Sequence, residues 1–143
     1  MTNYERRAEI TPEQRAFAAK SFHSMSFSKL IGMKLVDLRP DEAVIRIEMR
    51  DDLRQPDGVL HGGVTATLID TAMAFAIRTR LPVNESSATI DLTVHFLRPH
   101  TTGTITCTAR IVRAGKRIFT MAADVVNEDG KLVATAVSTY TRV

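Results

Sequence analysis

Residues 55–80, QPDGVLHGGVTATLIDTAMAFAIRTR, constrain the fold of this chain more than any other stretch. The segment begins with turn-forming residues and continues over residues 64–77 without Pro, Gly, Lys, Arg or Glu. Ala, Leu, Met and Ile dominate this second part, and these residues favour helices or burial. Apolar residues fall on nearly every side of the helical wheel, which is typical of an enclosed helix. The sequence therefore predicts a central helix that the rest of the chain surrounds.

One carboxylate, Asp70, lies in the middle of this apolar helix. The residues three and four positions away are Ala, Thr, Met and Ala, so the helix supplies no cation to pair with it. Burying an unpaired carboxylate is costly, and groups that bear such a cost are concentrated at functional sites. Asp70 is therefore either a catalytic carboxylate in a cleft, or a residue that faces solvent or is hydrogen-bonded by Thr67 and Thr71.

Composition and charge exclude several classes of protein. The 143 residues suffice for one domain, and the net charge of +3 comes without the basic run typical of nucleic-acid binding. The longest apolar run, residues 72–77, is too short to cross a bilayer, and residues 1–10 lack the apolar segment of a secretory signal. The one cysteine, Cys107, excludes an intramolecular disulfide, and no Cys/His cluster has metal-ligand spacing. We expect a cytoplasmic protein without metal, nucleic acid or membrane partners.

The residues before the central stretch predict a small N-terminal helix. Residues 11–25 form an amphipathic pattern, in which Thr11 is a suitable N-cap and Pro12 suits the first helical position. A short turn is expected to follow and to end at Gly32. We therefore divide the chain into an N-terminal helical extension, residues 1–26, and a main domain, residues 27–143.

Six further segments have the composition and alternation of β-strands. They cover residues 33–38, 42–49, 88–97, 104–113, 117–127 and 132–141. Short connections rich in turn residues separate the last four, which is typical of antiparallel neighbours. Strict alternation in the first of those four places Thr89, Asp91 and His95 on the face opposite Leu92. Strands of about 10 residues span roughly 33 Å, enough for one antiparallel sheet to wrap along the helix in an α+β fold.

The chain resembles the hotdog-fold acyl-CoA thioesterases, specifically the phenylacetate-pathway (PaaI-like) branch. The resemblance lies in GVLHGGV at residues 58–64, LID at residues 68–70, TIDLTVHFLRP at residues 89–99 and the Gly-Lys pair at residues 115–116. It implies a hotdog fold, in which a long antiparallel sheet wraps around one central helix. It also implies a homodimer joined sheet edge to sheet edge, with two dimers pairing as a tetramer. In this family each active site lies between two subunits.

The resemblance implies roles for the matched residues. Asp70 matches the family's catalytic carboxylate, which acts as nucleophile or as general base on water. Gly62 and Gly63 occupy the first helical positions, where amides and the helix dipole favour a developing oxyanion. We expect the Gly63 N–H to make the main oxyanion contact, supported by Gly62, although both glycines could serve only a tight turn. His61 is expected to order this loop, to cap the helix or to act near the thioester.

Further matched positions concern the substrate. Gln55 stands where the family often has an Asn near the thioester, and Thr89 matches a Ser or Thr that positions the attacking water or carboxylate. Four basic residues are candidates for binding the phosphates of coenzyme A: Arg98, Arg113, Lys116 and Arg117. Thioester hydrolysis requires no metal or separate cofactor, because coenzyme A is part of the substrate.

The geometry of a helix places the Asp70 carboxylate and the Gly63 N–H far apart within one chain. Asp70 lies roughly 10 Å from Gly63 by helical rise, too far for both to touch one carbonyl group of the same subunit. An active site shared between subunits resolves this separation and predicts an obligate dimer. Two alternatives remain open: a non-catalytic acyl-CoA-binding or regulatory hotdog domain, and a hotdog dehydratase, although Asp70 and its spacing from His61 favour hydrolysis.

Overall fold

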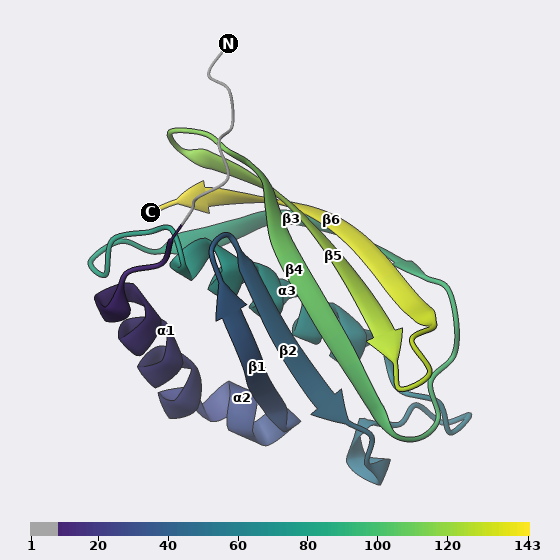
Figure 1. The fold of residues 1–143 in the computed structure, drawn as a ribbon. Coiled ribbons are helices and arrows are strands. Elements are labelled where there is room, and N and C mark those ends of the chain that lie inside the picture. The colour runs from purple at the N-terminus through teal and green to yellow at the C-terminus, as the bar shows by residue number, and fades with distance from the viewer. Residues whose placement is uncertain (1–8) are drawn as a thin grey trace.

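The computed structural model describes residues 9–143, in which one six-stranded antiparallel sheet curves around the helix α3 (Gly62–Arg78). Figure 1 shows α3 running behind the strands of the sheet. The buried residues of α3 form one broad side of the helix and include Leu68, Ile69, Ala72 and Met73, whereas residues on the opposite side, such as Asp70, are half-buried. The predicted α+β architecture, one sheet wrapped around one central helix, is confirmed.

The strands follow the order β1-β2-β4-β5-β6-β3 across the sheet. Their bounds are β1 (Met33–Arg39), β2 (Glu42–Glu48), β3 (Ser87–Phe96), β4 (Thr104–Ala114), β5 (Ile118–Asn127) and β6 (Leu132–Arg142). Each predicted strand is found, and its predicted ends agree with the observed ends to within about one residue. Different methods of assigning element ends disagree by as much. Along β4, four alternate residues turn inward and are buried: Ile105, Cys107, Ala109 and Ile111.

The neighbours of β3 differ from those expected. Short connections predicted that β3 would pair with β4, but β3 pairs with β6 at the edge of the sheet, and β4 pairs with β2 and β5. Residues 97–103 form a connection longer than a tight hairpin loop, so it leads the chain away from the edge. Its ends are held by hydrogen bonds from Leu97 N–H to Val133 O (2.8 Å) and from Met49 N–H to Gly103 O (2.9 Å). One side of β3 is therefore unpaired in the described chain.

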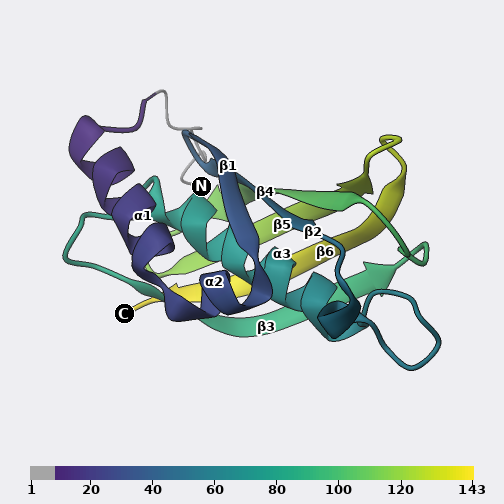
Figure 2. The same cartoon turned by 90° about the horizontal axis from the view of Figure 1, so that it is seen from below.

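Two helices cover the opposite edge, next to β1 (Figure 2). Helix α1 (Pro12–Ser24) has Thr11 as its N-cap, as predicted, and Gln14 completes a capping box; the helix buries Ala18 and Phe22 in the core. Helix α2 (Ser26–Ile31) forms where a turn was expected. Gly32 ends it in the left-handed conformation, at φ 81°, and the Arg50 guanidinium binds the last carbonyl groups. The first eight residues of the expected extension, 1–8, lie outside the described residues.

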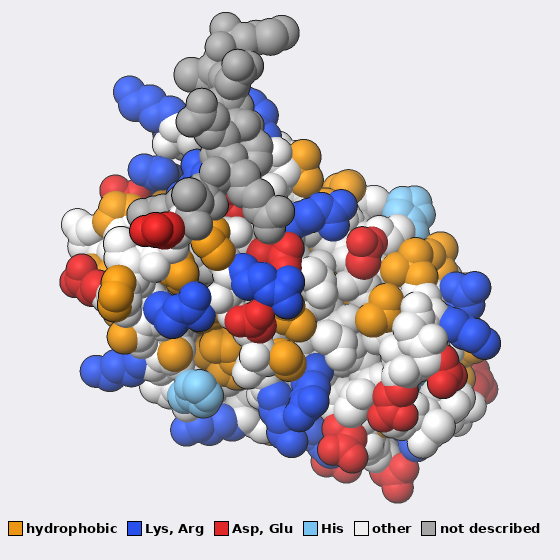
Figure 3. Space-filling view, in the orientation of Figure 1, with side chains coloured by type: hydrophobic (Ala, Val, Ile, Leu, Met, Phe, Trp, Pro, Cys, Tyr) orange, Lys and Arg blue, Asp and Glu red, His pale blue; other side chains and the backbone are white. Residues whose placement is uncertain are grey.

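The structure can be compared with the expectation of no membrane, metal or nucleic-acid partner. Within residues 9–143, no helix has the length and apolar character needed to cross a bilayer. In the same residues, no three His, Cys, Asp or Glu side chains are grouped to hold a metal ion. Figure 3 shows acidic and basic side chains interspersed on one face, without a broad patch of a single sign.

A buried ion pair fixes the end of α3 against the sheet. Asp41, in the turn between β1 and β2, is 1% exposed and has φ 63°. The Arg80 guanidinium donates to both of its carboxylate oxygens, at 2.8 Å from Nε and 2.9 Å from Nη2. The Asp41 N–H also donates to the Thr79 hydroxyl oxygen, at 2.9 Å. Since Thr79 and Arg80 follow α3 directly, these bonds set where the helix lies across the strands.

We predict that Arg80→Ala lowers the free energy of unfolding by about 3 kcal/mol, because it leaves a buried carboxylate without its guanidinium. Chemical denaturation of the variant and the wild type measures this loss. Arg39→Ala is the matched control, since it removes ion pairs to Asp37 and Glu42 that are made by a guanidinium 55% exposed to solvent. Equal stability of the two variants would contradict a structural role for the Asp41–Arg80 pair.

Candidate active site

Two strands hold one oxygen of the Asp70 carboxylate. The Thr89 hydroxyl, on β3, donates to Oδ1 at 2.8 Å. The Tyr140 hydroxyl, on β6, also donates to Oδ1, and it lies 2.7 Å from the main-chain oxygen of Asp70. No hydrogen bond from Thr67 or Thr71 to this carboxylate is formed within the described residues, so the expected alternative of local threonine partners is wrong.

The other carboxylate oxygen, Oδ2, remains open. Among residues 9–143 it takes part in no hydrogen bond, and the half-buried Asp70 side chain faces a hollow of about 260 Å³. The lining residues are Ala66, Thr67, Asp70, Thr89 and Leu92. An ionised carboxylate oxygen has free lone pairs that accept a proton or attack an electrophile. The arrangement therefore fixes the carboxylate through Oδ1 and leaves Oδ2 able to react.

Tyr140 is a site residue to which no sequence pattern pointed. Its side chain is 1% exposed, and burial, followed by the hydrogen bond to Asp70, raises the pKa of Tyr140. The phenol therefore keeps its proton and remains a hydrogen-bond donor. Only the strand register reveals this role, because Tyr140 pairs directly with Thr89 across β3 and β6.

A β-bulge turns Thr89 toward the helix. Thr89 pairs with Tyr140 and Asp91 pairs with the next residue back, Thr139, so Ile90 is an extra residue in β3. Thr89 consequently shares the inner face with Leu92, and Asp91 lies on the outer face, where its carboxylate accepts the Thr139 N–H at 2.9 Å. The expected grouping of Thr89 with Asp91 and His95 is therefore wrong, because strict alternation does not continue through a bulge.

The beginning of α3 offers one open amide. His61 is the N-cap, and its Nδ1 accepts the Gly63 N–H at 2.8 Å. A Cβ on Gly63 would lie 2.9 Å from that nitrogen, so a side chain here would displace the capping His61 ring. In the described part of the chain the Gly62 N–H has no hydrogen-bond partner. The expected main donor, Gly63, is thus occupied by the capping histidine, and the open donor is Gly62.

The loop that leads to Gly62 is tied to the connection after β3. The Arg54 guanidinium donates to Gly58 O at 2.6 Å and to Thr101 O at 2.8 Å, and the Leu60 N–H donates to His100 O at 2.8 Å. Gln55 is half-buried in this loop, and its main chain bonds to both Val59 and Gly58. The described residues give the Gln55 side chain no hydrogen-bond partner. Arg54, which carries no sequence signal of its own, orders the loop.

The four basic residues expected to bind coenzyme A are not together in one chain. Arg98 follows the end of β3, where its guanidinium donates to Leu132 O at 2.7 Å. Arg113, Lys116 and Arg117 lie at the β4–β5 hairpin, which adjoins the end of β6 and the start of β3. The two groups are therefore separated by the length of β3, roughly 33 Å for about 10 residues.

Comparison with known proteins identifies the family. The family model named Thioesterase superfamily matches residues 57–134, more than half of the chain. The chain belongs to this superfamily. A putative esterase of Halobacterium salinarum is 38% identical to this thioesterase, over 67% of this chain and 66% of the relative. The predicted enzyme class, a thioesterase, is thereby confirmed.

Two further comparisons concern the branch. The structure of a mutant of the phenylacetic acid degradation protein PaaI from Thermus thermophilus has a TM-score of 0.77 and 33% identity, covering 83% of this thioesterase and 100% of that chain. The medium/long-chain acyl-CoA thioesterase YigI of Escherichia coli is 26% identical, over 93% of this chain and 97% of the relative. The resemblance to hotdog thioesterases of the PaaI-like branch is confirmed.

We predict that Tyr140→Phe lowers kcat of this thioesterase at least about tenfold with little change in KM, since a hydrogen bond to a charged group contributes about 1.5–3 kcal/mol. Tyr140 does not line the hollow, so substrate binding should be preserved. Thr89→Val removes the second donor and should act in the same direction. Steady-state kinetics and thermal unfolding of both variants test this, and a kcat within twofold of wild type for Tyr140→Phe would refute the role of its hydroxyl.

Proposed function

We propose that this thioesterase hydrolyses the thioester of an aryl- or medium-chain acyl-CoA to the free acid and coenzyme A. The observation that carries the proposal is the pair of open groups: Asp70 Oδ2 in one hollow and the Gly62 N–H at the start of α3. Thioester hydrolysis requires these two elements, an oxygen that activates or performs the attack and a donor for the oxyanion. The names of the PaaI and YigI relatives agree with such a substrate.

Gly62 and Asp70 would act on one thioester from two subunits. Eight residues of helix separate them by roughly 12 Å, so one carbonyl group cannot reach both within one chain. A Cβ on Gly62 would lie 3.3 Å from the Phe96 ring, at one end of β3, whereas Asp70 bonds to Thr89 near the other end. Antiparallel pairing of two β3 edges about a two-fold axis brings the Phe96 end of one chain beside the Thr89 end of its partner.

The free edge of β3 supports this homodimer. An unpaired strand presents N–H and C=O groups that readily join another strand. Apolar side chains near this edge are strongly exposed, with exposed fractions of 55% for Ile90, 58% for Phe96 and 56% for Val137. Burying such side chains against a second copy is favourable. The further pairing of two dimers as a tetramer is a proposal that rests on the family resemblance. Action in the cytoplasm is a proposal that rests on the composition of the chain.

In the proposed mechanism the substrate carbonyl oxygen accepts the Gly62 N–H. Asp70 of the partner subunit then either takes a proton from water as the water attacks the carbonyl carbon, or attacks that carbon directly. The C=O electron pair moves onto oxygen, where the amide and the helix dipole stabilise it. When the carbonyl re-forms, the C–S bond breaks and the coenzyme A thiolate leaves and is protonated. Direct attack leaves an acyl anhydride on Asp70, which water hydrolyses.

The same pairing would assemble the basic residues. The hairpin that carries Arg113, Lys116 and Arg117 lies near the start of β3, so a two-fold axis through β3 brings the partner subunit's hairpin toward Arg98. Several cations near one opening suit the phosphates of coenzyme A. Thr89 would hold the attacking group, and Gln55 would flank the thioester from the loop before α3.

Two other functions differ from this proposal in a measurable way. A non-catalytic acyl-CoA-binding domain would bind the thioester and release no thiol, and a hotdog dehydratase would change the acyl chain and leave the thioester intact. The open Asp70 oxygen favours hydrolysis over a binding function, because a binding site gains nothing from a carboxylate that is fixed with one oxygen free. The spacing of His61 from Asp70 argues against the dehydratase.

We predict that Asp70→Asn lowers the rate of coenzyme A release at least about 100-fold, roughly 2.7 kcal/mol of transition-state stabilisation. Release of coenzyme A from a panel of aryl and fatty acyl-CoAs, monitored with a thiol reagent, measures the effect and identifies the substrate. If wild type binds acyl-CoA but releases no thiol, the binding function replaces this proposal.

The protein's own thiol should not disturb this assay. Cys107 is fully buried, and burial, followed by the charge of Asp124, raises the pKa of the Cys107 thiol. A thiol reagent reacts with the thiolate, so the native protein should give a flat enzyme-only blank.

We predict that mixing two inactive variants restores activity. Gly62→Pro removes the N–H at the first helical position, where proline is accommodated, and His61 already has the extended ψ of 128° that precedes proline readily. In a heterodimer of Gly62→Pro and Asp70→Asn chains, one of the two shared sites keeps both groups. Random assortment then restores about one quarter of wild-type activity.

Two controls accompany the mixing experiment. Gly62→Ala places the same Cβ near the Phe96 ring but keeps the N–H, so it should retain most activity. A chain that carries both Gly62→Pro and Asp70→Asn should restore nothing when mixed with either single variant. Failure of the two single variants to complement after co-refolding would show that Gly62 and Asp70 do not share a site across subunits.

A further inference from the structure

Two ionisable side chains on the outer face of β3 have no charged partner in their own chain. Asp91 and His95 both lie on the face of the sheet away from α3, and both are exposed. Asp91 Oδ1 accepts the Thr139 N–H, and Oδ2 has no hydrogen-bond partner within residues 9–143. In the same residues His95 forms no hydrogen bond and no ion pair. The mechanism proposed above uses neither side chain.

Among the described residues, no other charge on this face lies close to either side chain. The strand paired with β3 is β6, and its residues opposite Asp91 and His95 are threonines. Beyond them, Asp124 on β5 lies in the row of His95 and is 3.6 Å from the Arg110 guanidinium, and Arg113 on β4 lies in the row of Asp91. At about 4.8 Å per strand, Asp124 is about 10 Å from His95, and Arg113 is about 14 Å from Asp91. A close partner for either side chain therefore comes from the free edge of β3.

Symmetry limits the registers in which two β3 edges can pair. About a two-fold axis, the residue at the axis faces its own copy, and residues equally far on either side of it face each other. With the axis at Thr93, Asp91 of each chain faces His95 of the partner subunit. With the axis at Asp91 or His95, identical side chains would face each other, and with the axis at Leu92 or Val94 the two would not meet. Opposite charges directly across a ladder stabilise it, and like charges destabilise it.

We propose that the two β3 strands pair with Thr93 at the two-fold axis, and that Asp91 of each chain binds His95 of the partner subunit. The inference rests on the homodimer of the proposed function and defines its register. A protonated imidazole forms an ion pair with the carboxylate, and a neutral imidazole still donates one hydrogen bond to it. Because histidine gains its charge toward acid pH, the two pairs hold the dimer more tightly at pH 6 than at pH 8.

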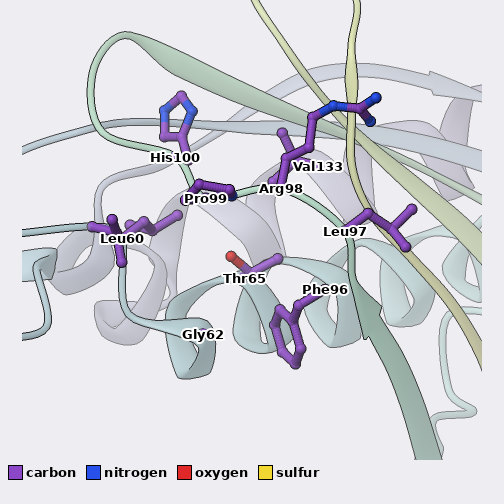
Figure 4. A pocket seen from close by; sticks show the side chains of 10 residues that line it. Leu60, Gly62, Thr65, Phe96, Leu97, Arg98, Pro99, His100 and Val133 are labelled. Carbon is purple, nitrogen blue, oxygen red and sulfur yellow. The ribbon is translucent and has the colours of Figure 1, made fainter. Parts of the chain in front are cut away.

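This register also suits the shared active site. It places Phe96 opposite Ile90 of the partner subunit, so two exposed apolar side chains meet. Phe96 and Gly62 line one pocket of about 290 Å³ at the start of α3 (Figure 4). Ile90 directly follows Thr89, whose hydroxyl donates to Asp70. Pairing in this register therefore brings the carboxylate of one chain toward the open amide of the other.

Single cysteines test the register, because a disulfide forms only between positions that lie close together. Under mild oxidation, Thr93→Cys should give a disulfide-linked dimer on electrophoresis without reductant. Asp91→Cys and His95→Cys should give none separately, since each position lies about 14 Å from its own copy, four residues along the strand. The two chains co-refolded together should give the linked dimer. The native Cys107 is fully buried, so wild type is the unlinked control.

Charge reversal tests the pair itself. At pH 6, the dimer of His95→Asp chains and the dimer of Asp91→Lys chains each contain two like-charged pairs, whereas a mixed dimer contains two attractive pairs. Equal amounts co-refolded should give at least about four fifths mixed dimer by native mass spectrometry, against one half at random. Wild-type dimer should dissociate about fivefold more readily at pH 8 than at pH 6. Asp91→Asn keeps an acceptor for the Thr139 N–H but has no charge, so it should lose this difference.

Several outcomes would overturn the inference. A linked dimer from Asp91→Cys or His95→Cys alone, no linked dimer from Thr93→Cys, or a random share of mixed dimers contradicts the register or the pair and leaves the proposed hydrolysis intact. A monomer in sedimentation velocity overturns both this inference and the shared site. A chain that passes both tests but releases no coenzyme A supports the pair and refutes the hydrolysis.

Discussion

Antiparallel pairing between β3 and β6 decides where the Asp70 carboxylate points. Thr89 and Tyr140 face each other in this register on the inner side of the sheet, so their hydroxyls converge on one oxygen of the helix carboxylate. Two donors on the same oxygen fix the side chain and leave the second oxygen unencumbered. A carboxylate held by strands rather than by its own helix keeps its position only while helix and sheet remain in place. For that reason the buried Asp41–Arg80 pair at the end of α3 bears on the site as well as on stability.

At the start of α3, as at Asp70, one group is held by a neighbour and the adjacent group is left free. A helix begins with amides that have no partner within the helix, and His61 takes one of them, the Gly63 N–H. The remaining donor is then the Gly62 N–H, held in a loop that Arg54 ties to the connection after β3. A donor fixed before substrate arrives needs no reorganisation during the reaction, which is how oxyanion contacts contribute most. The capping histidine thus determines which amide is available.

The sequence was sufficient for α1, α3 and the six strands, and insufficient for the short helix α2, the neighbours of β3 and the details of the site. The apolar run of α3 and the alternation in the strands reflect burial, which is visible in the residues of each segment. The motif around Gly62 and Asp70 identified the family. The face of Thr89 depends on a bulge, and the bond from Tyr140 depends on a register between strands about 50 residues apart in sequence. The choice between Gly62 and Gly63 depends on one side-chain rotamer, that of His61. None of these is recorded in a local pattern.

Pairing of two β3 strands in the proposed dimer would both complete the active site and cover an exposed strand edge. Each chain carries an open amide near Phe96 and an open carboxylate near Thr89, so both halves of a site exist but face different ends of one strand. The same strand is an unpaired edge with exposed apolar side chains, which in a monomer is a liability for aggregation. Antiparallel pairing with a second β3 would remove that edge and bring opposite ends together, so that two sites form at once. On this argument, selection against an exposed edge and selection for hydrolysis act on the same contact, and a variant that weakens β3 pairing should lose solubility and activity together.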